Sequence, residues 1–195
     1  MTDLLPYPSP NYRRGRRAAI THVILHTCES DSLDGCLSTL TDPYRVNEDG
    51  DLARVSAHYV VDDSGIYHLV NEEDEAWAAG AANRYGINIE VVGYADSPAT
   101  WTDAKLDHLA ELLADVTQRN AIPLVYRDTA TDAPLDRGIV AHGALDPARR
   151  SDPGIFFPWN DVKSRISRLR GAFPAPATAA GLAFVAAAIA VWVTR

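Results

Sequence analysis

The chain has 195 residues, of which 47% are hydrophobic and 23% are charged, a balance typical of a globular protein and not of a disordered one. Its 18 basic and 26 acidic residues give a net charge of −8, so the body of the protein repels polyphosphates and nucleic acid is excluded as a general partner. The length suits one compact domain with a short appendage, and we expect a monomer.

The N-terminal residues 1–17 contain three prolines and no long apolar run, which indicates an extended arm and argues against a secretory signal peptide. The two cysteines, Cys28 and Cys36, lack zinc-finger spacing. We expect them to be thiols in a reducing compartment, with a bridge between them as the alternative. Cys28 is also a candidate soft metal ligand, because it would share a strand face with His26.

The middle of the chain alternates strand patterns with helix patterns. Strands are predicted for residues 19–25, 56–61, 66–70 and 87–92, and the second and third form a hairpin around the turn 62–65. The fourth strand alternates, so that one face carries Ile87, Ile89 and Val91 and the other carries Asn88, Glu90 and Val92. Helices are predicted for residues 33–40, 102–119 and 160–169, with Thr102 as an N-cap. We therefore predict an α/β fold, in which one domain over residues 18–170 has a central mixed β-sheet flanked by helices.

The C-terminal end has a different composition. Residues 171–176 form a proline-containing hinge, and residues 177–195 form an apolar tail that has no charge from 177 to 193. This tail reaches the short limit for a transmembrane helix, and Trp192 suits an interfacial anchor; a buried apolar helix is the alternative. Basic residues before the tail outnumber Arg195 after it, so a spanning tail would keep the domain in the cytoplasm.

Three side chains are candidate metal ligands. His26 and His142 each end an apolar run, and Asp152 lies ten residues after His142 in a turn. We interpret His22 as a packed core residue and His108 as a solvated one. A catalytic zinc takes about three such ligands, but this chemistry alone does not single out the trio, because similar sets can be chosen from most sequences.

Six short blocks, spread in order between about Ile20 and Trp159, together resemble the type 2 N-acetylmuramoyl-L-alanine amidase family. That family includes amidase-type phage lysozymes and peptidoglycan recognition proteins. Three features resemble endolysins of phages that infect actinobacteria: Asn83, the strand that carries Glu90, and the segment of residues 153–159. The blocks are residues 23–27 (VILHT), 56–61 (SAHYVV), 76–80 (AWAAG), 87–93 (INIEVVG), 141–143 (AHG) and 151–154 (SDPG).

The resemblance implies three ligands for Zn²⁺, namely His26, His142 and Asp152. It also implies that Glu90 is the general base, that Tyr59 stands beside the zinc and that Arg150 replaces a catalytic lysine. Each of these three has a structural alternative: Glu90 could be a solvated sheet position, Tyr59 a strand aromatic and Arg150 a surface cation. Arginine keeps the positive charge of lysine but disfavours proton donation. Ala78 stands where many members have histidine.

The activity implied by the resemblance is zinc-dependent hydrolysis of the amide bond between N-acetylmuramic acid and L-alanine in peptidoglycan. We expect a phage endolysin held in the host cytoplasm, associated with the membrane through the tail, with residues 126–137 as a cleft-side loop. The alternatives are a non-catalytic peptidoglycan-binding module, a cytoplasmic cell-wall recycling amidase and a membrane-anchored scaffold. No Gly-x-Ser-x-Gly motif is present, which argues against a serine hydrolase.

Overall fold

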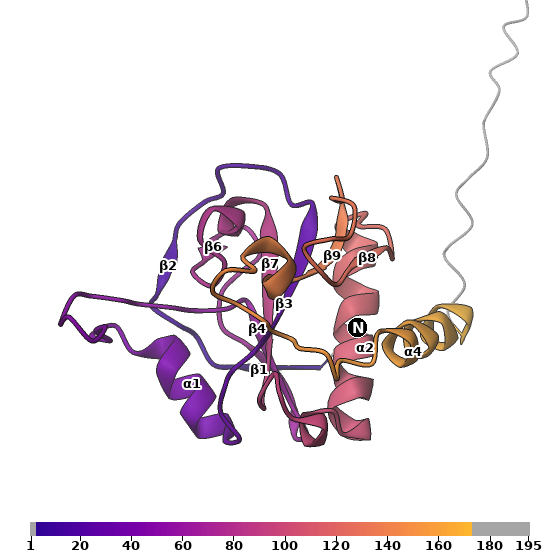
Figure 1. The fold of residues 1–195 in the computed structure, drawn as a ribbon, viewed down its shortest axis with the longest axis horizontal. Coiled ribbons are helices and arrows are strands. Elements are labelled where there is room, and N and C mark those ends of the chain that lie inside the picture. Colours follow the sequence, from indigo (N-terminus) through magenta and orange to yellow (C-terminus); the bar gives the residue numbers. More distant parts are fainter. Residues whose placement is uncertain (1–2, 173–195) are drawn as a thin grey trace, which may run out of the picture.

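A seven-stranded mixed sheet lies at the centre of the computed structural model, which describes residues 3–172 (Figure 1). The strand order is β1-β5-β4-β7-β3-β9-β8, and neighbours are parallel except for the antiparallel hairpin β4–β5. The strands are β1 (Leu4–Pro6), β3 (His22–Thr27), β4 (Tyr59–Asp62), β5 (Gly65–His68), β7 (Gly86–Val91), β8 (Tyr126–Arg127) and β9 (Gly138–Ala141). The predicted α/β class with a mixed sheet is confirmed.

Helices cover both faces of the sheet. Helices α2 (Asp103–Arg119) and α4 (Trp159–Ala172) lie together on one face, and α1 (Leu33–Thr41) lies on the other (Figure 1). Short helical turns complete the fold: η1 (Gly80–Arg84), η2 (Pro98–Thr100) and α3 (His142–Leu145). The three predicted helices are confirmed, and the Thr102 side chain caps α2 by accepting a hydrogen bond from the backbone N–H of Lys105.

The alternation of β7 separates a structural face from a polar one. Ile87, Ile89 and Val91 are at most 1% exposed and pack in the core beneath α2. Because successive strand residues point to opposite faces, Asn88 and Glu90 point away from α2. The sequence pattern predicted this division, and it determines where polar chemistry can occur.

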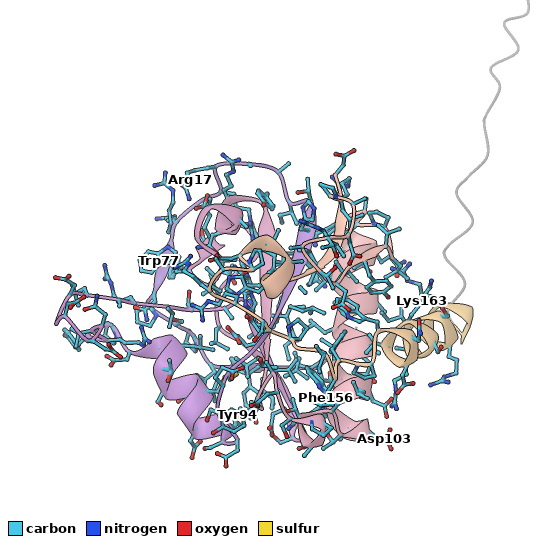
Figure 2. All side chains as sticks on the ribbon, in the orientation of Figure 1. Arg17, Trp77, Tyr94, Asp103, Phe156 and Lys163 are labelled. Atoms are coloured by element: carbon cyan, nitrogen blue, oxygen red, sulfur yellow. A yellow bond between two sulfur atoms is a disulfide. The ribbon has the colours of Figure 1, made fainter. Side chains whose placement is uncertain are left out.

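The N-terminal segment, predicted as an extended arm, pairs with the rest of the fold through two short strands. Strand β1 pairs in parallel with β5, and β2 (Tyr12–Arg13) pairs with β6 (Glu75–Ala76) in a second, two-stranded sheet. Figure 2 shows Arg17 and Trp77 on the side that carries β2 and β6, and Asp103 and Lys163 on the side of α2 and α4. Arg17 donates to both carboxylate oxygens of Glu75 at 2.7–3.0 Å, which anchors the segment.

A disulfide joins Cys28 to Cys36 and corrects the expectation of free thiols. Cys28 follows the end of β3 directly, and Cys36 lies on the inner face of α1, where it is 2% exposed. The two sulfur atoms meet because α1 packs over this end of the strand. Cys28 is therefore not available as a metal ligand.

The predicted apolar tail lies outside the described residues, as does all but the beginning of the hinge. Within residues 3–172, every helix is too short or too polar to cross a bilayer.

Candidate metal centre

The carboxyl ends of three parallel strands bring the candidate residues to one edge of the sheet. His26 is paired in register with Glu90 on the adjacent strand β7. His142 follows directly after β9, the strand on the other side of β3. Because parallel strands end at the same edge, these side chains lie together although 116 residues separate the two histidines in the chain.

Asp152 reaches the same edge from the turn 151–154. The backbone N–H of Gly143 donates to the carbonyl oxygen of Asp152 at 2.8 Å, which ties the turn to the start of α3. Gly154 adopts a φ of 90° and packs against the carbonyl group of Ala95, so the turn requires glycine at this position. The turn thus holds the Asp152 carboxylate in place beside His142.

Three donor atoms converge in a buried cluster of His26, His142 and Asp152. Nδ1 of His26 lies 3.0 Å from Oδ2 of Asp152, and Nδ1 of His142 lies 3.2 Å from the same oxygen. All three ligand atoms lie within 4.8 Å of one another, and the residues are 2%, 5% and 8% exposed. The structure therefore brings together the trio that the resemblance indicated.

The chemistry of this donor set fits zinc. Two imidazoles and a carboxylate are a common protein ligand set for zinc, and ligands bound tetrahedrally at about 2.0–2.1 Å lie about 3.3 Å apart. The observed separations of 3.0 and 3.2 Å are close to that value. The metal-binding protonation states are also favoured: burial lowers the pKa of His26, against the opposing effect of Asp152. Burial raises the pKa of Asp152, but hydrogen bonding to its carboxylate, above all from His142, outweighs it and keeps that pKa below its usual range.

Glu90 and Arg150 line the same pocket, which has a volume of about 400 Å³. Glu90 is 8% exposed, and within the described part of the chain no hydrogen-bond partner reaches its Oε2. Burial, together with the nearby charge of Asp152, raises the pKa of Glu90 well above its usual value, while Arg150 acts in the opposite direction. An unpaired, buried carboxyl group beside a metal-type ligand set is a candidate proton acceptor.

A second hollow of about 630 Å³ adjoins this pocket and shares His142 and Arg150 with it. Its wall includes Trp77, over which the guanidinium of Arg54 lies 5.2 Å from the ring centroid. The two hollows together form a larger open space beside His142.

Tyr59 does not lie at this centre, which corrects the expectation that it stands beside the metal. Tyr59 is in register with Ile89, and its neighbour Val60 is in register with Glu90. Its side chain therefore points to the opposite face of the sheet, where the hydroxyl donates to Oε1 of Glu72 at 2.9 Å and accepts from Nη2 of Arg119 at 3.0 Å. The block 56–61 located the strand correctly, but the alternation of side chains along β4 directs Tyr59 to the face opposite the pocket.

Three further expectations are corrected or refined. None of the residues 126–137 lines the pocket, and the loop leads into β9 at its amino end, away from His142. His22, at that same end, is half-buried, and its Nε2 lies 3.0 Å from the carbonyl oxygen of Leu135. His108, predicted to be solvated, is half-buried, and its Nδ1 contacts the carbonyl oxygen of Asp62 at 2.9 Å.

Sequence reasoning gave no role to Asn88, although it placed this residue on the same strand face as Glu90. In the structure Asn88 is fully buried, and its Oδ1 lies 3.1 Å from Nε2 of His26. The sequence signal that could have identified Asn88 is a polar amide two residues before Glu90, in a strand whose other residues are apolar.

Comparison with known proteins gives concordant matches. The family model described as N-acetylmuramoyl-L-alanine amidase matches residues 16–155. N-acetylmuramoyl-L-alanine amidase A of Achromobacter lyticus is 30% identical over 171 residues, which cover 83% of this chain and 91% of that protein.

Solved structures share the fold. A crystal structure of an AmpD derivative superposes with a TM-score of 0.67 at 20% identity, over 85% of this chain and 96% of that one. The amidase AmiD from Escherichia coli, solved with the substrate anhydro-N-acetylmuramic acid-L-Ala-D-gamma-Glu-L-Lys, superposes with a TM-score of 0.56 at 27% identity. That match covers 78% of this chain and 60% of AmiD.

Proposed function

The chain belongs to the N-acetylmuramoyl-L-alanine amidase family, and from this premise we propose that it hydrolyses the bond between N-acetylmuramic acid and L-alanine in peptidoglycan with a zinc ion held by His26, His142 and Asp152. The observation that carries the proposal is the convergence of these three buried donor atoms beside the unpaired carboxyl group of Glu90. A bound zinc ion would supply Lewis-acid chemistry and make a water molecule nucleophilic near neutral pH.

Glu90 is the proposed general base. Glu90 lines the pocket, and its Oε2 has no hydrogen-bond partner among the described residues, so the carboxylate is free to take a proton from the attacking water. The same carboxyl group then gives that proton to the leaving nitrogen of L-alanine as the carbon–nitrogen bond breaks. Burial raises the pKa of Glu90, and a higher pKa makes its carboxylate a stronger proton acceptor in the first step.

Arg150 is the proposed electrostatic partner of the reacting carbonyl group. Attack on the amide places negative charge on the carbonyl oxygen, and the Arg150 guanidinium lines the pocket two residues before Asp152. Because a guanidinium does not lose its proton in proteins, Arg150 stabilises charge without taking part in proton transfer.

The biological role that we propose is lysis of the wall by a phage endolysin. The sequence blocks support this role, as does the Cys28–Cys36 disulfide, because disulfides persist in oxidising compartments and a cytoplasmic recycling enzyme works in a reducing one. A comparison of turnover on intact sacculi and on soluble anhydro-muropeptides tests it. Preference for the soluble fragments would favour recycling instead.

The activity is tested by digesting purified peptidoglycan with the full-length protein, in the zinc-loaded and the chelator-treated form. We expect mass spectrometry to detect intact glycan strands and free L-alanine amino termini only with the zinc-loaded protein. The matched control is His142→Ala, which removes one ligand and should abolish both zinc retention and product release. Wall binding without any release by the zinc-loaded protein would identify a non-catalytic binding module and overturn the proposal.

A further inference from the structure

A chain of hydrogen bonds leads from the backbone of the 76–79 segment to the imidazole of His26. Its first member is Asn83 in η1, whose Oδ1 accepts from the backbone N–H groups of Ala78 at 3.2 Å and Ala79 at 2.7 Å. A side-chain nitrogen could not accept from two N–H donors. The backbone therefore determines which end of the Asn83 amide is the oxygen.

The second member is Asn88, which is fully buried and has no access to water. Its Nδ2 donates to Oδ1 of Asn83 at 3.1 Å and to the carbonyl oxygen of Ala76 at 3.4 Å. Both of those atoms are acceptors, so only the amino end of the Asn88 amide can face them. Its oxygen then faces Nε2 of His26 at 3.1 Å.

An amide oxygen can only accept a hydrogen bond, so Nε2 of His26 must carry the proton. A neutral imidazole has one proton, and the Nδ1 atom is then left with a free lone pair. That lone pair points toward Oδ2 of Asp152, which is 3.0 Å away and is itself an acceptor. Nδ1 and Oδ2 are then two acceptors in contact, and the Asn88 oxygen beside Nε2 disfavours the tautomer that would move the proton to Nδ1. Such a pair of acceptors favours a cation between them.

We propose that Asn83 and Asn88 are positioning residues that hold His26 in the Nε2–H tautomer, with Nδ1 presented for the metal before the metal arrives. The inference rests on the metal site of the proposed function and adds the device that prepares one of its ligands. The contribution of the two asparagines is to orient a ligand and to remove the cost of a tautomer change on binding.

The tautomer can be read directly in the metal-free protein. Long-range ¹H–¹⁵N correlation spectra of histidine-labelled wild-type protein should show His26 with a protonated Nε2 and an unprotonated Nδ1. This measurement needs neither a variant nor activity. Observation of the Nδ1–H form would overturn the inference.

Two substitutions at position 88 separate positioning from folding. Asn88→Leu removes the acceptor for His26, and we expect zinc affinity, measured by competition with a chelator, to weaken roughly 10- to 100-fold. Asn88→Asp keeps an acceptor facing His26 but loses the donor toward Asn83 and Ala76, so it should destabilise the fold and yet recover most of the lost zinc affinity. Equal zinc affinity in the wild type and Asn88→Leu, or equal loss in both variants, would overturn the inference.

The matched control is Asn120→Ala on the other side of the sheet. Nδ2 of Asn120 also donates two hydrogen bonds, at 2.9 Å to Glu72 and at 3.0 Å to the carbonyl oxygen of Val116, but it has no contact with the metal centre. Asn120→Ala should lower stability and leave zinc affinity unchanged. A wild-type protein that binds no zinc would refute the proposed function itself, whereas zinc binding that is insensitive to Asn88→Leu would refute only the positioning role.

Discussion

The side of the strand on which a residue lies decides whether it can reach the pocket. Glu90 and Ile89 are neighbours in the chain, yet Glu90 lines the pocket and Ile89 is packed beneath α2. Tyr59 is in register with Ile89 and shares its face. The proposed chemistry therefore belongs to the polar face of β7, and two predictions test this division.

Glu90→Gln should lower kcat by roughly 10²- to 10⁴-fold, because it removes the proposed proton acceptor while preserving the size of the side chain. Zinc content should stay at the wild-type level, since Glu90 is not among the three converging ligands. The measurement is steady-state release of L-alanine amino termini together with metal analysis. Wild-type turnover in this variant would remove Glu90 from the proposed mechanism.

Tyr59→Phe should leave kcat and zinc affinity unchanged, because the hydroxyl points away from the pocket and contacts Glu72 and Arg119. The loss of these two hydrogen bonds should lower the free energy of unfolding by about 1 kcal/mol. Urea denaturation and the hydrolysis assay check the two parts. A large fall in kcat without a change in stability would restore the catalytic role that the sequence suggested.

The first helix forms a wall of the pocket and is covalently tied to the strand that carries His26. Cys36, Thr39 and Leu40 of α1 line the pocket, and Cys28 lies two residues after His26. The disulfide therefore joins an element that shapes the pocket to an element that supplies a ligand.

Replacement of both cysteines by serine should lower the free energy of unfolding by about 2–3 kcal/mol, the value that chain entropy gives for a loop with a sequence separation of 8. The measurement is urea denaturation under oxidising conditions, with the wild-type protein in dithiothreitol as the control for loss of the bond alone. Identical stability of the variant and the oxidised wild type would contradict this stabilising contribution of the disulfide.

In the molecule as a whole, the face opposite the pocket is held by a polar cluster around Glu72. Its carboxylate accepts hydrogen bonds from Tyr59, Arg119 and Asn120, which connects the chain after β5 to the end of α2. Burial raises the pKa of Glu72, but the hydrogen bonds from Arg119, Asn120 and Tyr59 outweigh it and lower the pKa below its usual value. The ionised form is thus favoured in the folded state.

Because the pKa of Glu72 is lower in the folded state than in the unfolded state, the protein loses stability as the pH falls. Glu72 contributes to the free energy of unfolding at pH values above its unfolded-state pKa of about 4.5. This contribution is lost as the pH falls through the lower pKa of the folded state. Glu72→Gln should therefore lower the free energy of unfolding at pH 7 by about 1–3 kcal/mol, nearer the lower end because Arg119 is partly exposed to solvent. The difference from wild type should shrink at pH 3, as measured by urea denaturation of both metal-free proteins. A difference that is constant between the two pH values would contradict this account.

Local patterns in the sequence were sufficient to locate the main strands and helices. Hydrophobic periodicity located the hairpin β4–β5 and the three longer helices, because each signal depends on residues only a few positions apart. The alternation of β7 likewise predicted that Glu90 faces away from the core. The metal trio came from resemblance, since ligand types alone do not select His26, His142 and Asp152 from a whole chain.

The tertiary structure decided everything that depends on how strands are placed side by side. Register turned Tyr59 away from the pocket, and the packing of α1 over the end of β3 joined Cys28 to Cys36. Register also brought Asn88 to His26, across strands that are 62 residues apart at this contact. A local pattern records which face of its own strand a residue occupies, whereas a site is formed by the faces of several strands, and their pairing is determined by the packing of the whole core.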